Sequence, residues 1–146
     1  MGKIREVKSL IPHREPFLFV DKLAEVDEKV TVGYYHFKAE DFFFKGHFPN
    51  YPIVPGVLLI EVMAQCGGAG VNQMGIVEEG SIFVLASIEK AKFRQPVLPG
   101  TTVKIVVKNL KVSKTMLRQS GKVLVGEEVA AEASWFCLVT EGAHDH

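Results

Sequence analysis

The segment GHFPNYPIVPGVLLIEVMAQ, residues 46–65, joins a proline-rich loop directly to the most apolar stretch of the chain. Its three prolines hold the loop in extended or turn conformations, because each ring fixes φ and biases the preceding residue away from the α region. From Val57 to Met74 the residues are good helix formers or small, and nothing rigid interrupts them before Gly75. The pattern predicts one helix that begins near Pro55 and Gly56.

This predicted helix is apolar on nearly every face, which is typical of a helix buried in a protein core. Glu61 is its only charged residue, so the carboxyl group is expected in a poorly solvated place. A buried carboxylate costs several kcal/mol unless it is paired or protonated. Gln65, one turn later on the same face, is the expected hydrogen-bond partner. His47 lies on the stiff loop before the helix, so the segment predicts an acid–base pair.

A plainer interpretation exists for each of these residues. Glu61 can lie on a narrow solvated stripe with Gln65 and Asn72, and His47 can simply cap a turn. For each residue taken alone, this structural role is commoner than a catalytic role. Together they describe an unusual surface helix, because so thin a polar stripe would face a rigid histidine loop. Positioned histidine and carboxyl groups suit proton transfer, so we favour the acid–base pair.

The composition indicates one domain with a substantial core, since 47% of the 146 residues are hydrophobic and no long linker or repeat interrupts them. We expect this domain to cover residues 1–140. The polar tail at 141–146, which carries His144 and His146, is expected to be disordered. The 17 acidic and 17 basic residues balance, which argues against a nucleic-acid binder that relies on overall charge.

We expect a cytoplasmic protein without a membrane span. The N-terminus is charged and amphipathic rather than a signal sequence. The most apolar run, Val57 to Val71, is shorter than the roughly 20 residues of a membrane span and contains Glu61. Cys66 and Cys137 lie far apart in apolar surroundings and are expected to be reduced core residues. The histidines have no metal-type spacing, and neither a metal nor a cofactor is expected.

The rest of the chain predicts a β-sheet. A short helical start is expected at 4–10, and a tight turn at Asp27 and Glu28. Six segments rich in β-branched and aromatic residues are the predicted strands: 17–26, 29–38, 81–93, 102–112, 115–125 and 127–139. One apolar helix and six strands describe an α+β fold, in which an antiparallel sheet curls around the helix.

Three glycines lie within the predicted helix, at Gly67, Gly68 and Gly70. Each would weaken an isolated helix by about 1 kcal/mol. We therefore expect another backbone to approach the helix closely at these positions. The alternative is that the helix ends near Gly67.

Three stretches of this chain resemble the FabZ-type β-hydroxyacyl-acyl-carrier-protein dehydratases of type II fatty-acid synthesis. They are IPHREPFLFVD at 11–21, the block at 46–65, and AKFRQPVLPG at 91–100. The central block is quite specific, since it sets a histidine, several prolines, a glycine and a carboxylate in one order. The resemblance runs from Ile11 to about Val139 and implies the hotdog fold, an antiparallel sheet wrapped around one long central helix.

In that family the histidine of the Gly-His-Phe-Pro motif and a carboxylate on the central helix are the catalytic pair, which implies His47 and Glu61 here. The related dehydratase/isomerase class places Asp at the position of Glu61, so the resemblance favours the simple dehydratase. The two catalytic residues of the family meet across a dimer interface. The resemblance therefore implies a homodimer with two shared sites, and it suggests hexamers built from three dimers.

The implied reaction is the reversible removal of water from a (3R)-3-hydroxyacyl thioester to give the trans-2-enoyl thioester. His47 would remove the C2 proton, and Glu61 would protonate the departing 3-hydroxyl. The backbone N–H of Gly56 at the helix start is a candidate donor to the thioester oxygen. The other expected substrate-binding residues are Val57, Gln65 and Phe48. Candidates for an acyl tunnel, which core packing explains equally well, are Phe42, Phe43, Phe44, Phe48, Tyr51 and Phe83.

The resemblance also implies a partner, an acyl carrier protein that bears the substrate on phosphopantetheine. Such carriers are usually acidic, so the docking surface should be basic. Lys90, Lys92 and Arg94 alternate with Ala91 and Phe93, which places all three on one face of a predicted strand. A solvated strand face explains the same three residues equally well.

Two motif positions depart from the family. Gln95 stands where members often have a second basic residue, and Glu15 stands where an aromatic residue is more usual. We interpret His13 and Arg14 as loop-structuring residues without a catalytic role.

Three alternative functions stay open. A hotdog thioesterase would direct water at the thioester carbonyl and release free thiol. A non-catalytic binding module for acyl chains or carrier protein would bind without turnover. A dehydratase with added isomerase activity would also form a cis-3-enoyl product.

Overall fold

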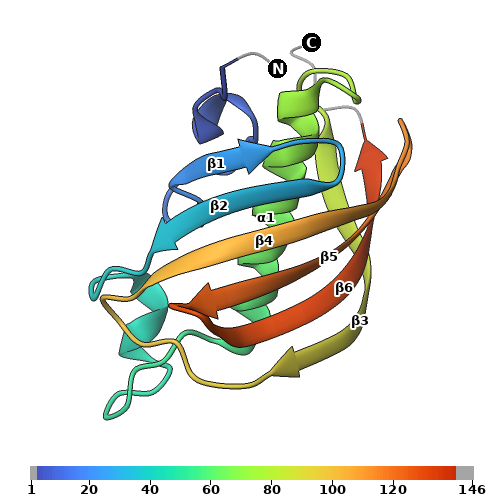
Figure 1. Cartoon of the computed structure of the whole chain (residues 1–146). Coiled ribbons are helices and arrows are strands. Elements are labelled where there is room, and N and C mark those ends of the chain that lie inside the picture. Colours follow the sequence, from blue (N-terminus) through green and yellow to red (C-terminus); the bar gives the residue numbers. More distant parts are fainter. Residues whose placement is uncertain (1–2, 141–146) are drawn as a thin grey trace.

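The computed structural model describes residues 3–140, and the tail at 141–146 that we expect to be disordered lies outside them. A six-stranded antiparallel sheet curves around one long helix (Figure 1). The elements in chain order are η1 (Val7–Ser9), β1 (Lys22–Val26), β2 (Val30–His36), η2 (Phe42–Lys45), α1 (Gly56–Met74), β3 (Ile82–Phe93), β4 (Thr102–Val112), β5 (Met116–Val125) and β6 (Glu128–Thr140). None of the helices among these residues is long and apolar enough to cross a membrane.

The strands lie in the order β1-β2-β4-β5-β6-β3, so β3 forms an edge of the sheet although it follows α1 directly in the chain. The predicted turn between β1 and β2 is confirmed, since Asp27 Oδ1 accepts hydrogen bonds from the N–H groups of Lys29 and Val30. Gly126 has φ +61 between β5 and β6, a left-handed conformation that glycine adopts without a steric cost. The hotdog arrangement that the resemblance implies is confirmed.

The central helix begins and ends where the sequence predicts, at Gly56 and Met74. Gly75 follows with φ +73 and donates its N–H to the carbonyl of Asn72, a left-handed cap that ends the helix. The helix contacts every strand of the sheet, which explains why it is apolar on nearly all faces. The alternative that the helix ends near Gly67 is wrong.

Side chains, rather than another backbone, lie against the three helix glycines, so that part of the prediction is wrong. A Cβ atom at Gly67 would collide with the Gln119 side chain, and one at Gly70 would collide with Thr31. At Gly68 a Cβ would lie 2.8 Å from the ring of Phe83. The glycines therefore let strand side chains approach the helix backbone, and tertiary packing offsets their low helix propensity.

The N-terminal region differs most from the prediction. Between residue 3 and β1 only Val7–Ser9 are helical, and they form a 3₁₀ turn rather than a helix over 4–10. The first strand begins at Lys22 instead of residue 17. Residues 17–19 bond to a helix side chain instead of a strand, because the Phe19 N–H and the Phe17 carbonyl both contact the amide of Gln65.

Candidate active site

Glu61 lies one and a half turns into α1 with 22% of its side chain exposed. Gln65 donates a hydrogen bond from Nε2 to Glu61 Oε2 at 2.9 Å, as the one-turn spacing predicts. The Gln65 amide is itself held in place, because its Oε1 accepts from the Phe19 N–H at 2.8 Å and its Nε2 donates to the Phe17 carbonyl at 3.0 Å. The buried glutamine therefore fixes one oxygen of the carboxyl group.

His13 also faces this carboxyl group, which the sequence did not indicate. Its Nε2 lies 3.6 Å from Glu61 Oε2, and its Nδ1 is buried without a hydrogen-bond partner. Burial lowers the pKa of His13, an effect that outweighs the attraction of Glu61 and is reinforced by Arg14. The only available signal was the position of His13 in the first motif, just before the residues that bond to Gln65.

Arg14 has the loop-structuring role that we expect. Its guanidinium donates hydrogen bonds to the backbone carbonyls of Lys8, Ile11 and His13, at distances between 2.6 and 3.0 Å. These bonds tie residue 14 to the backbone of η1 and of the loop that follows it.

Glu61 opens onto a pocket of about 220 Å³ between α1, the start of β3 and the first motif. Its polar lining comes from Glu61, His13 and Gln65. The remaining lining is small or apolar: Ile11, Ala64, Gly68, Phe83, Val84, Leu85 and Cys137. Burial raises the pKa of the Cys137 thiol to about 12, and the nearby Glu61 adds to the shift. The pocket offers one carboxyl group in surroundings suited to an acyl chain.

His47 lies on the loop that follows η2, and backbone bonds hold it in place. Its N–H donates to the carbonyl of Phe43 at 3.2 Å, and its carbonyl accepts from the N–H of Ile53 at 2.9 Å. The ring stacks on Phe48 with 4.3 Å between ring centroids. Nδ1 lies 3.2 Å from the carbonyl oxygen of Ile53. Because a carbonyl only accepts, Nδ1 carries a proton, and Nε2 is the ring nitrogen that can accept one.

The single chain does not bring His47 and Glu61 together. Within residues 3–140, no hydrogen bond or ion pair joins the two side chains, and His47 is not part of the lining of the Glu61 pocket. Each residue has its own supporting contacts, on the loop and on the helix respectively. A site that uses both must bring these two places together.

The other predicted substrate-binding residues lie at the start of α1 and on the histidine loop. Pro55 precedes the helix without a side-chain cap, and the backbone bonds of the first turn begin at the N–H of Leu58. A Cβ at Gly56 would lie 2.9 Å from the ring of Phe93, so glycine leaves room for that ring. Val57 and Phe48 are exposed.

The tunnel candidates separate into three groups. Phe43 and Phe44 belong to the core, whereas Phe42, Phe48 and Tyr51 are exposed. Of the six aromatic candidates, only Phe83 lines the Glu61 pocket.

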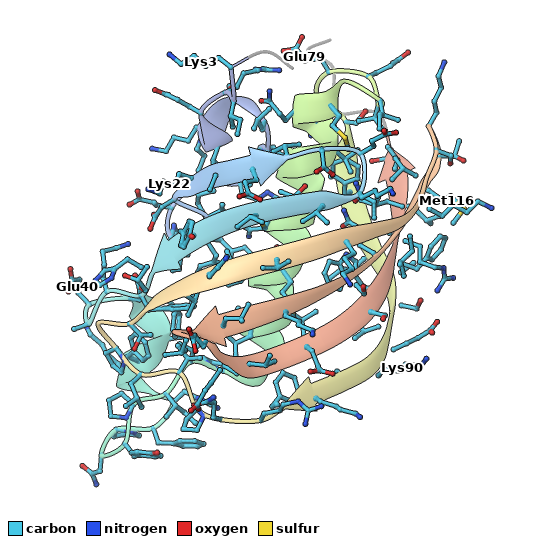
Figure 2. All side chains as sticks on the ribbon, in the orientation of Figure 1. Lys3, Lys22, Glu40, Glu79, Lys90 and Met116 are labelled. Atoms are coloured by element: carbon cyan, nitrogen blue, oxygen red, sulfur yellow. The ribbon has the colours of Figure 1, made fainter. Side chains whose placement is uncertain are left out.

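The three basic residues proposed for docking do not follow simple alternation. The register of β3 against β6 shifts between Glu89 and Lys92, and Lys90 has φ +54. Lys90 lies beside the β3 ribbon, away from α1 (Figure 2). Arg94 lies beyond the end of β3 and forms an ion pair of 3.1 Å with Glu132, whose pKa it lowers. A bulge therefore interrupts the predicted strand face. Glu132 partly neutralises the positive charge of Arg94.

Comparisons with known proteins identify the family of this chain. The family model of the FabA-like domain matches residues 11–134. The chain is 45% identical over 134 residues to the 3-hydroxyacyl-[acyl-carrier-protein] dehydratase FabZ of Desulforamulus reducens, covering 91% of this chain and 94% of that protein. It is 41% identical over 143 residues to the enzyme of the same name from Fusobacterium nucleatum, covering 97% and 99%.

A solved structure shows the same fold. The dehydratase heterocomplex ApeI:P from Xenorhabdus doucetiae superimposes with a TM-score of 0.83, covering 95% of this chain and 93% of that chain. The sequence identity of 14% makes this a likeness of fold alone.

Proposed function

This chain belongs to the FabA-like domain family, and from that premise we propose that it dehydrates 3-hydroxyacyl-[acyl-carrier-protein] with His47 and Glu61 as its acid–base pair. It is a hydro-lyase of the FabZ type in fatty-acid biosynthesis, similar to relatives named 3-hydroxyacyl-[acyl-carrier-protein] dehydratase FabZ. The observation that carries the residue assignment is the hydrogen bond from Gln65 to Glu61 Oε2, which orients a lone carboxyl group at the wall of a largely apolar pocket.

His47 is suited to take the C2 proton of the substrate. The thioester carbonyl makes this proton acidic, and the bond from Nδ1–H to the Ile53 carbonyl leaves Nε2 free to accept it. The same carbonyl stabilises the imidazolium that forms. A positioned base of this kind contributes ~10²–10⁴-fold to the rate.

Glu61 is suited to protonate the leaving hydroxyl. As the C2–H bond breaks, its electrons form the C2–C3 double bond, the C3–O bond breaks, and the oxygen leaves as water with the proton from Glu61. Transfer of a proton from His47 back to Glu61, directly or through solvent, restores both groups. The reverse sequence hydrates the enoyl thioester.

Charge that develops on the thioester oxygen needs a hydrogen-bond donor. The first N–H groups of a helix have no intrahelical acceptor and lie at the positive end of the helix dipole. The N–H of Gly56, the first residue of α1, is such a group. We assign it the role of an oxyanion donor.

We propose that two subunits share each site, with His47 from one and Glu61 from the other. The edge strand β3 offers unpaired N–H and C=O groups along one side. It also carries exposed apolar residues, among them Val84 and Ile88, and Val57 on α1 is 72% exposed in the single chain. Pairing of two β3 strands would cover these groups and give a homodimer with two sites, and three such dimers could assemble further.

The remaining assignments follow from this function. We propose residues 1–140 as one catalytic domain in the cytoplasm, and an acidic acyl carrier protein as the partner that presents the substrate. Lys90 and Lys92 are the proposed docking residues, together with Arg94, whose charge is shared with Glu132.

Hydration of a crotonyl thioester, followed as loss of the ultraviolet absorbance of the enoyl group, tests the proposal. His47→Ala and Glu61→Gln should each abolish turnover while the fold and native mass are retained. Mixing the two inactive variants should restore activity, because one of the two sites in a mixed dimer is intact.

Other outcomes would support the alternatives. Release of free thiol would indicate a thioesterase, and a cis-3-enoyl product would indicate added isomerase activity. Binding of acyl carrier protein without turnover of crotonyl or longer enoyl substrates would indicate a binding module. Full activity in either variant would remove that residue from the catalytic pair.

A further inference from the structure

His13 is a titratable group beside Glu61 that the chemistry proposed above leaves unused. Its Nε2 lies 3.6 Å from Glu61 Oε2, and both side chains line the same pocket. Gln65 Nε2 donates to the same oxygen at 2.9 Å. Within residues 3–140, no hydrogen bond or ion pair involves the other oxygen, Oε1.

The position of Nε2 opposite Glu61 Oε2 decides which tautomer of His13 fits. Nδ1 is enclosed without a hydrogen-bond partner, so it is unsatisfied both with a proton and without one. A proton on Nε2 points toward Glu61 Oε2, an oxygen that accepts whether Glu61 is ionised or carries its own proton on Oε1, whereas a lone pair on Nε2 would be repelled by the lone pairs of that oxygen. Burial also keeps the ring neutral, since it lowers the pKa of His13. The state that fits is the neutral ring with the proton on Nε2.

A purely structural role for the imidazole is not supported by its contacts. Arg14 already holds the loop through the carbonyls of Lys8, Ile11 and His13. The ring nitrogens of His13 make no hydrogen bond to that loop in the described part of the chain. Among residues 3–140, the ion-pair contact of Nε2 is with Glu61.

We propose that His13 is a positioning residue that directs its Nε2–H at Glu61 Oε2, so that Oε1 exchanges the proton with the 3-hydroxyl of the substrate. This inference rests on the proposed role of Glu61. When Oε1 gives up its proton, negative charge spreads over both carboxyl oxygens, and the donors on His13 and Gln65 stabilise it. The benefit arises as the charge develops, so it affects kcat rather than KM.

Kinetics of two substitutions test this role. His13→Phe keeps a flat ring but removes the donor, and His13→Gln keeps an N–H donor near the place of Nε2. We expect kcat to fall about tenfold or more in His13→Phe with KM within about twofold, since a single donor to a developing anion is worth up to ~10²–10³ at closer range. His13→Gln should recover most of this loss. His36→Phe is the matched control, because His36 is exposed and bonds to Thr102 outside the pocket.

Three kinetic outcomes would overturn the proposal. Equal losses in His13→Phe and His13→Gln would mean that the ring is needed only for packing. A change confined to KM would mean that His13 contacts the substrate. Unchanged kcat in His13→Phe would mean that the contact with Glu61 has no role.

A measurement on the wild-type protein covers the case in which His13→Phe does not fold. Nitrogen-15 NMR of the histidine rings reports which nitrogen carries the proton. We expect a protonated Nε2 and a bare Nδ1 at His13 near neutral pH, with a changed Nε2 signal in Glu61→Gln. A proton on Nδ1 would contradict the proposal.

Subunit mixing separates this inference from the proposed function. In a mixed dimer of His13→Phe and His47→Ala, one site combines intact His47 with intact His13 and Glu61, so that site should have full activity. A mixed dimer of His13→Phe and Glu61→Gln has no such site and should gain nothing. Failure of the wild type to hydrate enoyl thioesters would overturn the proposed function, whereas the NMR result would still decide the tautomer and the contact.

Discussion

Gln65 connects the reactive carboxyl group to the N-terminal segment through a single amide. Both of its N–H bonds are used, one by Glu61 and one by the Phe17 carbonyl, and its oxygen accepts from the N–H of Phe19. The sequence predicts Gln65 as a substrate-binding residue. Its contacts support a positioning role instead, because no donor is left for a substrate.

Replacement of Gln65 by leucine should therefore affect both stability and activity. The Phe19 N–H and the Phe17 carbonyl lose their partners, and a buried unpaired group costs about 1–3 kcal/mol. We expect the free energy of unfolding to fall by about 2–4 kcal/mol in a urea titration, and kcat to fall as Glu61 loses its donor. Gln73→Leu is the control, since Gln73 also bonds to the N-terminal segment but is more exposed. Similar losses in both variants would contradict the role of Gln65.

His13 should make the folded state less stable in acid. Its pKa is lowered from 6.5 by burial, so below pH 6.5 the unfolded chain binds a proton that the folded chain does not. The free energy of unfolding is retained above pH 6.5 and decreases as the pH falls from there to the lowered pKa of the folded state. Unfolding of the wild type and of His13→Gln, compared between about pH 7.5 and pH 5, should show a smaller decrease in the variant. An identical decrease of the free energy of unfolding in both proteins would show that His13 does not contribute to the acid sensitivity of the fold.

At the scale of elements, the helix and sheet pack closely at Gly67. The Gln119 side chain occupies the space that a Cβ would need. Gln119 is completely buried, accepts a hydrogen bond from Trp135 Nε1 at 3.2 Å and donates one to Asn109 at 2.8 Å. The Gln119 amide beneath the helix is thus held in place by Trp135 and Asn109.

Gly67→Ala should destabilise the protein although alanine is the better helix former. Helix propensity favours alanine by about 1 kcal/mol, but displacement of Gln119 disturbs its hydrogen bonds to Trp135 and Asn109, and overpacking costs about 1–3 kcal/mol. A lower midpoint of thermal unfolding is the expected result. In a double-mutant cycle, Gln119→Ala should reduce the effect of Gly67→Ala, because it removes the group that collides. A higher midpoint of thermal unfolding for Gly67→Ala alone would show that the Gln119 side chain can move away from the added methyl group without a loss of stability.

At the scale of the whole molecule, the separation of His47 and Glu61 makes assembly a requirement of the proposed chemistry. Ile88 lies on the edge strand β3 with 46% of its surface exposed. Ile88→Asp should weaken the pairing of two β3 strands, since it places a charge in an interface that is apolar in the proposal. We expect a smaller native mass by light scattering, and activity that rises with protein concentration. A monomer with full activity would refute the shared site.

The sequence by itself determined the features that depend on neighbouring residues. Turn chemistry and periodicity placed the central helix at 56–74 and the strands β4 to β6 to within one residue of their observed ends. The motif at 46–65 singled out His47 and Glu61, and the spacing of one turn predicted the bond between Glu61 and Gln65. These features follow from local geometry, which the order of residues specifies directly.

Only the tertiary structure decided the features that depend on residues far apart in the chain. His13 contacts Glu61, and Gln65 forms hydrogen bonds with the backbone of residues 17–19. Strand side chains also pack against the helix glycines. These contacts join segments that no periodicity in the sequence relates. The bulge at Lys90 broke an alternation that looks regular in the sequence, because pairing with β6 sets the register of β3. These contacts depend on how all elements of the molecule pack together, so a local sequence pattern does not determine them.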